Sequence, residues 1–311
     1  TVDSCDSDKG CVHVAVDDGG VCNDGDSCTA NDGCIGGKCV GTPPSATVST
    51  WAGSVQGYTD AKGELAAFKA PTGVARAADG VLYVADIGDH RVRKIAVDQT
   101  VTTLAGQGVV GEVDDTGVAA RFYGPAALAL NADGDLVVLD SGSHKVRLVK
   151  VADGAVTTLA GSNTPGGFGK PPVGGFADGK GALAQLKTPM GIAASGVGFF
   201  IADAGNHRIR TLAADGSVGT LAGAGGEGGS DGPVATATFA SPYGVAVDGA
   251  GAVWVAEFGG HRIRRISGAT VATIAGDGVV GAADGKGASA RFSAPWGLWF
   301  DGAGALLVAD S

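Results

Sequence analysis

The stretch IADAGNHRIRTL, residues 201–212, contains the pattern that decides the fold. An apolar run ends at an acid, a short turn with glycine follows, and a histidine begins a second apolar run that carries two basic residues two positions apart. The same pattern occurs four times, as VADIGDHRVRKI (84–95), VLDSGSHKVRLV (138–149), IADAGNHRIRTL (201–212) and VAEFGGHRIRRI (255–266). A motif that recurs at intervals of 54 to 63 residues indicates a repeat architecture.

Two further motifs recur in register with the first. A proline with a glycine two residues later opens each unit: APTGVA (70–75), GPAALA (124–129, with Ala127 in place of the glycine), TPMGIA (188–193), SPYGVA (241–246) and APWGLW (294–299). An apolar run that ends in Ala-Gly closes each unit: VSTWAG (48–53), VTTLAG (101–106), VTTLAG (156–161), VGTLAG (218–223) and VATIAG (271–276). Four short Val/Ile/Leu-rich runs separated by glycine turns predict four antiparallel strands, which is the content of a β-propeller blade.

These residues resemble the NHL repeat. The resemblance covers residues 46–311 and rests on DAGNHRIR (203–210), on the Pro-x-Gly motif, and on GYTDAKGELAAFKAP (57–71) and GAADGKGASARFSAP (281–295). It implies an all-β NHL β-propeller, a fold that has six blades in most members. Within this sequence we predict four complete blades, a partial fifth and an N-terminal closing strand at 47–53, and a natural chain that continues past Ser311.

The first 45 residues form a separate segment, so the predicted domains are 1–45 and 46–311. All six cysteines lie here, at Cys5, Cys11, Cys22, Cys28, Cys34 and Cys39. An even, local cluster in a loop-rich stretch predicts disulfides and an oxidising compartment, and it lacks the C-x2-C pair that would favour the alternative of zinc. The segment resembles the Asp/Cys-rich repeats of large secreted or surface proteins of myxobacteria-like bacteria, which implies a stalk. Asp24, Asp26 and Asp32 form an acidic loop whose oxygen atoms suit one calcium ion; a solvated acidic stretch is the alternative.

The acid and the histidine of the repeat stand four residues apart in every copy. The pairs are Asp86 and His90, Asp140 and His144, Asp203 and His207, and Glu257 and His261. Because a catalytic site is one place, four copies around a ring indicate a structural role. We expect each carboxylate to hold the imidazole N–H across the turn. A ligand role would require a histidine that points into the central channel.

Other constant columns are also interpreted as scaffold. An aspartate stands 11 residues before each proline, where it can cap a turn; calcium in each loop is the alternative. These are Asp60, Asp114, Asp178, Asp231 and Asp284. The paired basic residues share one face of a strand, and we expect their charged heads to pair with acids. The phenylalanines three residues before four of the prolines, with Leu186 in the third copy, are expected between blades.

Function is expected in the columns that vary. The residue after each proline should lie near the channel mouth, and it changes from Thr72 and Ala126 to Met190, Tyr243 and Trp296. The loop before the third proline is about nine residues longer than its counterparts and carries Phe168, Lys170 and Phe176. We predict a binding site formed by Phe168, Lys170, Phe176, Met190, Tyr243 and Trp296; ordinary packing and a neutral surface insertion are the alternatives.

The predicted function is a binding or structural module of a larger secreted or cell-surface bacterial protein, with a protein or glycan partner or other chains of a surface assembly. The net charge is −10, of which residues 46–311 carry −4. This charge opposes the nucleic-acid binding that resemblance to the NHL domains of tripartite-motif proteins would imply. No apolar run is long enough to span a membrane. The alternative is a metal-dependent hydrolase or lyase with its site on the axis, as in some similar propellers; no catalytic residue is predicted.

Overall fold

The computed structural model describes residues 5–6, 10–11, 30–35, 38–42, 48–166, 171–301 and 303–311. Its contacts divide the chain into two units, Thr1–Ser49 and Thr50–Ser311. In the first unit, β1 (Cys5–Asp6) pairs with β2 (Gly10–Cys11), and β3 (Ala30–Ile35) pairs with β4 (Lys38–Thr42). Both pairs are antiparallel. Their registers set Cys5 opposite Cys11 and Cys34 opposite Cys39.

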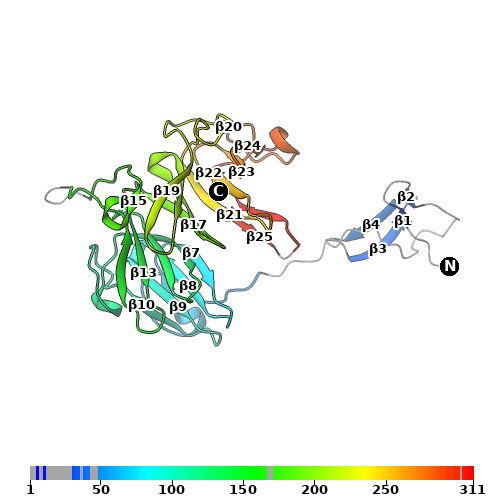
Figure 1. Cartoon of the computed structure of the whole chain (residues 1–311). Helices are drawn as coiled ribbons and strands as arrows, with labels where there is room; N and C mark the ends of the chain where they lie inside the picture. The colour runs from blue at the N-terminus through cyan, green and yellow to red at the C-terminus, as the bar shows by residue number, and fades with distance from the viewer. Residues whose placement is uncertain are drawn as a thin grey trace. The chain divides into compact units, whose positions relative to one another are not determined.

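The second unit repeats one antiparallel sheet four times, and we call these sheets blades 1 to 4 (Figure 1). Blade 1 holds β7 (Pro71–Arg76), β8 (Leu82–Asp86), β9 (Arg91–Ile95) and β10 (Val101–Ala105). Blade 2 holds β11 (Pro125–Leu130), β12 (Leu136–Asp140), β13 (Lys145–Val149) and β14 (Val156–Ala160). Blade 3 holds β16 (Pro189–Ser195), β17 (Gly198–Asp203), β18 (Arg208–Leu212) and β19 (Ser217–Ala222), with β15 (Gly179–Lys180) added outside β19. Blade 4 holds β21 (Pro242–Val247), β22 (Val253–Glu257), β23 (Arg262–Ser267) and β24 (Thr270–Ala275), with β20 (Gly232–Pro233) added outside β24.

The strands begin and end at the residues that the repeat predicts. In each blade the first strand begins at the anchor proline, the second ends at the acid, and the third begins directly after the histidine. The remaining elements of the second unit are short: the parallel pair β5 (Val55–Gln56) and β6 (Ala67–Phe68), and six 3₁₀ turns. The described residues contain no α-helix, so no helix there is long and apolar enough to cross a membrane.

The first strands of successive blades lie side by side around the axis: β7 contacts β11, β11 contacts β16, and β16 contacts β21. This crowding explains the Pro-x-Gly glycine, since a Cβ on Gly73 would come within 2.9 Å of the Ala126 carbonyl oxygen of the next blade. Between the blades, fully buried side chains three residues before the anchor prolines anchor the core. They are Phe122, Leu186 and Phe239, as expected for that column.

A fifth sheet contains only β25 (Gly297–Phe300) and β26 (Leu306–Ala309). The N-terminal closing strand is not formed: residues 48–53 contain no strand, and the Gly53 N–H donates to the Gly63 carbonyl (3.0 Å). The reason lies in the pairing of the complete blades, where the run that ends in Ala-Gly pairs with the third strand of its blade. Among the described residues, the fifth sheet contains only a first and a second strand, β25 and β26.

Candidate functional site

Each complete blade encloses one buried arginine between two carboxylates. The arginines are Arg93, Arg147, Arg210 and Arg264, and all four are fully buried. Each one bonds the acid that ends the second strand and the aspartate that stands 11 residues before the proline. In blade 2, Arg147 lies 3.2 Å from Asp140 and 2.5 Å from Asp114. In blade 4, Arg264 lies 2.8 Å from Glu257 and 2.7 Å from Asp231. The expectation that these cationic heads pair with acids is therefore met inside each blade.

Each network has one arginine and two acids, so it carries one excess negative charge when both acids are ionised. The inner carboxylates are buried, and burial disfavours their charged form. Burial raises the pKa of Asp86 and of Asp140 to about 6 and the pKa of Glu257 to about 7, and it raises the pKa of Asp203 in the same direction. The outer aspartates remain partly exposed and can balance the arginine alone. The inner acid is therefore the group of each network that takes up a proton as the pH falls below neutral.

The predicted acid–histidine bond is wrong, because the inner carboxylates accept instead from arginine and from backbone amides. The histidines bond the following blade. Nδ1 accepts the N–H of the residue before the next proline: Thr188 on His144 (3.0 Å), Ser241 on His207 (3.2 Å) and Ala294 on His261 (3.0 Å). In blade 1, Nδ1 of His90 is buried and has no partner in the described structure. The histidine column is thus an inter-blade link, which is made at three of its four positions.

The aspartate column makes structural contacts within each complete blade. Asp114, for example, accepts the Thr158 N–H (2.9 Å) besides its arginine. Among the described residues, no three His, Cys, Asp or Glu side chains lie close enough together to hold a metal ion. Of the predicted calcium ligands, Asp24 and Asp26 lie outside the described residues, and Asp32 is described only as part of the β3 backbone. Cys22 and Cys28 also lie outside them.

Three residues of the long third loop were predicted to bind a ligand. Phe168 and Lys170, both predicted to bind a ligand, lie outside the described residues. Phe176 does not line a cavity on the axis; its ring packs under Arg208 and Arg210, whose guanidinium carbons lie 3.7 and 4.8 Å from its centroid. Tyr58 packs in the same way in blade 1. Phe176, which is 44% exposed, thus repeats the contact of Tyr58, as its position two residues before the column aspartate could have indicated, and its role in binding stays a prediction.

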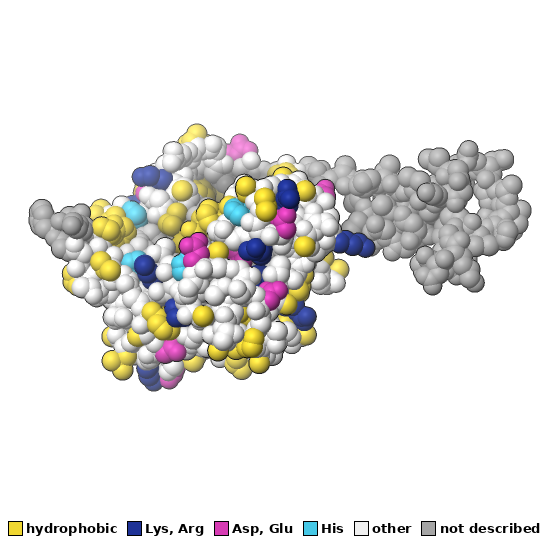
Figure 2. Space-filling view, turned by 90° about the horizontal axis from the view of Figure 1, so that it is seen from above, with side chains coloured by type: hydrophobic (Ala, Val, Ile, Leu, Met, Phe, Trp, Pro, Cys, Tyr) yellow, Lys and Arg dark blue, Asp and Glu magenta, His cyan; other side chains and the backbone are white. Residues whose placement is uncertain are grey.

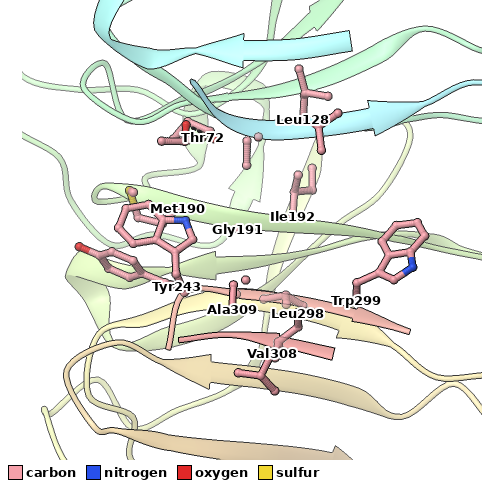
Figure 3. Close-up of a pocket in the computed structure, with 18 of the residues that line it drawn as sticks. Thr72, Leu128, Met190, Gly191, Ile192, Tyr243, Leu298, Trp299, Val308 and Ala309 are labelled. Carbon is pink, nitrogen blue, oxygen red and sulfur yellow. Dashed lines mark hydrogen bonds between the residues drawn. The ribbon is translucent and has the colours of Figure 1, made fainter. Parts of the chain in front are cut away.

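The residues after the anchor prolines converge on one cavity at the axis, which we call the mouth cavity. It has a volume of about 530 Å³ and is lined by all five of them: Thr72, Ala126, Met190, Tyr243 and Trp296. In blades 1 to 4 this residue forms a β-bulge in the first strand. The proline before it pairs with the acid of the second strand, the residue after it pairs with the next residue of that strand, and the residue between them has no partner. A bulge redirects the side chain of the extra residue. Figure 3 shows Met190, Tyr243 and Thr72 at one end of this cavity and Trp299 at the opposite end.

Aromatic rings gather on one side of the mouth cavity. Tyr243 stacks on Phe258, with ring centroids 4.4 Å apart, and Trp296 meets both rings edge to face at 4.9 and 5.7 Å. All three side chains are half-buried. Burial raises the pKa of the Tyr243 hydroxyl, so it stays protonated at neutral pH. Sequence reasoning missed Phe258; its signal is the column directly after the acid, where the other blades have Ile87, Ser141 and Ala204.

The channel continues into a second cavity of about 450 Å³, lined by the middle and far parts of the first strands. The described side chains that line these two cavities include no carboxylate, imidazole or thiol, and Arg76 is their single charged group. The set of protein ligands that a metal-dependent hydrolase or lyase on the axis would require is therefore not found among these described residues.

A further pocket of about 440 Å³ opens at the junction of blades 1, 2 and 3, and we call it the junction pocket. It is lined by Ile87, His90, Tyr123, Gly124, Ser141, Gly142, His144, Pro171, Pro172, Thr188 and Met190. Met190 also lines the mouth cavity, so the two hollows adjoin. Figure 2 looks onto a face on which histidine side chains lie among hydrophobic ones.

Comparison with known proteins supports the repeat. Residues 122–147, which run from Phe122 of the core to Arg147 of the network, match the model of the NHL repeat. The chain is 29% identical over 276 residues to the protein SUPPRESSOR OF QUENCHING 1, chloroplastic, of Arabidopsis thaliana, with 82% of this chain and 25% of that protein covered. It is 27% identical over 305 residues to NHL repeat-containing protein 2 of Gallus gallus, with 69% and 41% covered. The chain thus spans less than half of each of these relatives.

Solved structures agree on the fold. An auxiliary nutrient binding protein of Bacteroides thetaiotaomicron has a TM-score of 0.53 at 18% identity, with 70% of this chain and 55% of that chain covered. A chain of a nidogen/laminin complex has a TM-score of 0.50 at 17% identity, with 77% and 72% covered. At this level of identity the likeness speaks for the fold alone. The repeated sheets and these likenesses together support a β-propeller fold, with an NHL repeat matched at residues 122–147.

Proposed function

We propose that this propeller is a ligand-binding module of a secreted or cell-surface protein, and that the mouth cavity binds a neutral glycan. The observation that carries the proposal is the meeting of Tyr243 and Trp296, both packed against Phe258, at a cavity of about 530 Å³ whose described lining has no charged side chain. Binding sites for small ligands have volumes of roughly 300 to 1,000 Å³ and combine apolar walls with a few polar groups.

The chemistry of the lining favours a sugar. Aromatic faces carry partial negative charge and attract the C–H groups on the apolar face of a sugar ring, and a tyrosine hydroxyl adds a polar group at the edge of the platform. The Thr72 hydroxyl donates to the Ala126 carbonyl (2.7 Å), so its oxygen keeps lone pairs for an incoming hydroxyl. An ionic ligand would find no counter-charge among these described residues.

The proposed extracellular location rests on the first 45 residues. Six cysteines lie within the first 39 positions, and the other 272 positions have none. Cysteines that face each other on antiparallel strands have Cα separations compatible with a disulfide, as the register offers for Cys34 and Cys39. The structural similarity to an auxiliary nutrient binding protein is in keeping with a binding role. Thiol titration of the unfolded, unreduced chain should find few free thiols; six would contradict this location.

The binding proposal is tested by screening the full chain on an array of neutral and charged glycans, followed by calorimetric titration of the hits. We expect neutral glycans among the hits. Replacing Trp296 by Ala should weaken their binding at least tenfold, because the platform loses its largest ring. The matched control is Trp51→Ala, since Trp51 is 48% exposed and does not line the mouth cavity. Equal effects of the two substitutions, or no glycan bound, would overturn the proposal.

A further inference from the structure

We propose that the junction pocket is a second subsite of the same face, so that the ligand is a neutral oligosaccharide that spans the junction pocket and the mouth cavity. This inference rests on the proposed function, and it specifies the length of the ligand. The two hollows share Met190 as a common wall, so a chain that leaves the mouth cavity over Met190 enters the junction pocket directly.

The outer wall of the junction pocket is fixed in place. It consists of Pro171 and Pro172. Both belong to the long third loop, and the corresponding loops of the other blades are shorter. The His144 Nδ1 accepts the Thr188 N–H, which leaves its Nε2–H to donate to the Pro172 carbonyl (3.2 Å). Beyond it, Val173 exchanges two backbone hydrogen bonds with Thr164, at 2.8 and 3.0 Å. The proline wall is therefore built into the pocket by a histidine that is 8% exposed.

His90 gives the junction pocket a free polar group. Its counterparts each accept a backbone N–H from the next blade, whereas the described structure gives its Nδ1 no partner. In the next blade Gly124 stands before the proline in place of Thr188, Ser241 or Ala294. The ring of His90 meets Tyr123 edge to face, with centroids 6.3 Å apart. Because no backbone amide holds this imidazole, its ring can turn and offer a nitrogen to a ligand hydroxyl.

The chemistry of the junction pocket repeats that of the mouth cavity. Tyr123 and the two proline rings provide flat apolar surfaces, while the Thr188 hydroxyl and the His90 imidazole provide polar atoms around them. No carboxylate, lysine or arginine is among the described lining residues. Burial lowers the pKa of His90, which keeps it neutral at pH 7. Two adjoining neutral hollows, each with ring faces and hydroxyl partners, fit successive rings of one uncharged chain.

The test is calorimetric titration of the full chain with cello-, malto-, xylo- and manno-oligosaccharides of one to six rings. We expect one series to bind, with an affinity that rises at least tenfold between a single ring and the shortest chain that reaches both hollows. His90→Ala and Tyr123→Ala should each lower the affinity for that chain about tenfold and leave the single ring unchanged. The matched control is His261→Ala, because His261 occupies the same column but lines neither hollow; it should keep the dependence on chain length.

The outcomes separate this inference from the proposed function. Affinity that does not depend on chain length, or that neither His90→Ala nor Tyr123→Ala changes, would overturn the second subsite while Trp296→Ala still tests the mouth cavity. Failure of every neutral sugar to bind would overturn both. Selective binding of peptides from a random peptide library, lost in Tyr123→Ala, would replace the oligosaccharide by a peptide and contradict the inference as stated.

Discussion

The buried networks and the mouth cavity come from the same repeat, and they differ in what the repeat keeps constant. Each complete blade places an arginine between two acids, and these groups satisfy one another within the blade. At the mouth, the four blades and the fifth sheet each contribute the residue after the anchor proline to a shared cavity, and these five residues differ from Thr72 to Trp296. The comparison teaches that constant columns hold the ring together and that varied columns facing one space are available for recognition.

The largest effect is expected when a network loses its arginine. Arg147→Met keeps the volume of the side chain but leaves Asp140 buried with no cation, and breaking a buried pair costs about 3 to 5 kcal/mol. The surface pair of Lys62 and Asp98 provides the control, since both side chains are largely exposed and Lys62→Met should hardly change the stability. Urea denaturation measures both. A small loss in Arg147→Met would mean that the networks do not hold the blades.

A smaller effect is expected at the inter-blade histidines. His144→Ala removes the partners of the Thr188 amide and of the Pro172 carbonyl, whereas His207→Ala removes only that of the Ser241 amide. At about 1 kcal/mol for each hydrogen bond, His144→Ala should lower the free energy of unfolding about twice as much as His207→Ala. Thermal and urea unfolding of both variants measure the ratio. Equal losses would show that the Pro172 contact contributes nothing.

Features formed within one repeat could be predicted from the sequence, whereas contacts between separate blades could not. The strands were predictable because proline, acid, histidine and Ala-Gly mark their ends in every copy. The position of Met190, Tyr243 and Trp296 at one cavity followed from the same register. The acid's partner was missed, although the hairpin pairs Asp86 with Arg91 and so brings Arg93 to the same face. The link from His144 to Thr188 joins separate blades, and the junction pocket depends on the path of the long loop; neither is encoded in local spacing.

The subtlest effect is a dependence on pH that the networks impose. The pKa of Glu257 rises from 4.5 to about 7 in the folded protein, so the folded state keeps a proton that the unfolded chain releases. Stability should therefore fall as pH rises from about 4.5 to 7, and the raised pKa values of Asp86 and Asp140 act in the same direction. Melting temperatures at pH 5, 6, 7 and 8 measure this trend.

Glu257→Gln isolates one group in that trend. The Glu257 Oε1 accepts from Ala240 and Arg264, while its Oε2 is buried with no partner in the described structure. A glutamine can keep both bonds at its oxygen without carrying a charge, so the variant should lose part of the pH dependence, while its buried NH2 group, which has no acceptor, lowers stability at every pH. A steeper dependence in Glu257→Gln would show that Glu257 is ionised in the fold.

The most direct test of the comparison is a crystal structure of the full chain with the tightest-binding neutral oligosaccharide from the titrations. The account predicts sugar rings against Trp296 and Tyr243 in the mouth cavity, with the chain continuing over Met190 toward His90, and unchanged contacts in the buried networks. Sugar density at the outer rim of the blades, or in contact with the network residues in place of the mouth, would contradict the division between constant scaffold and varied binding columns.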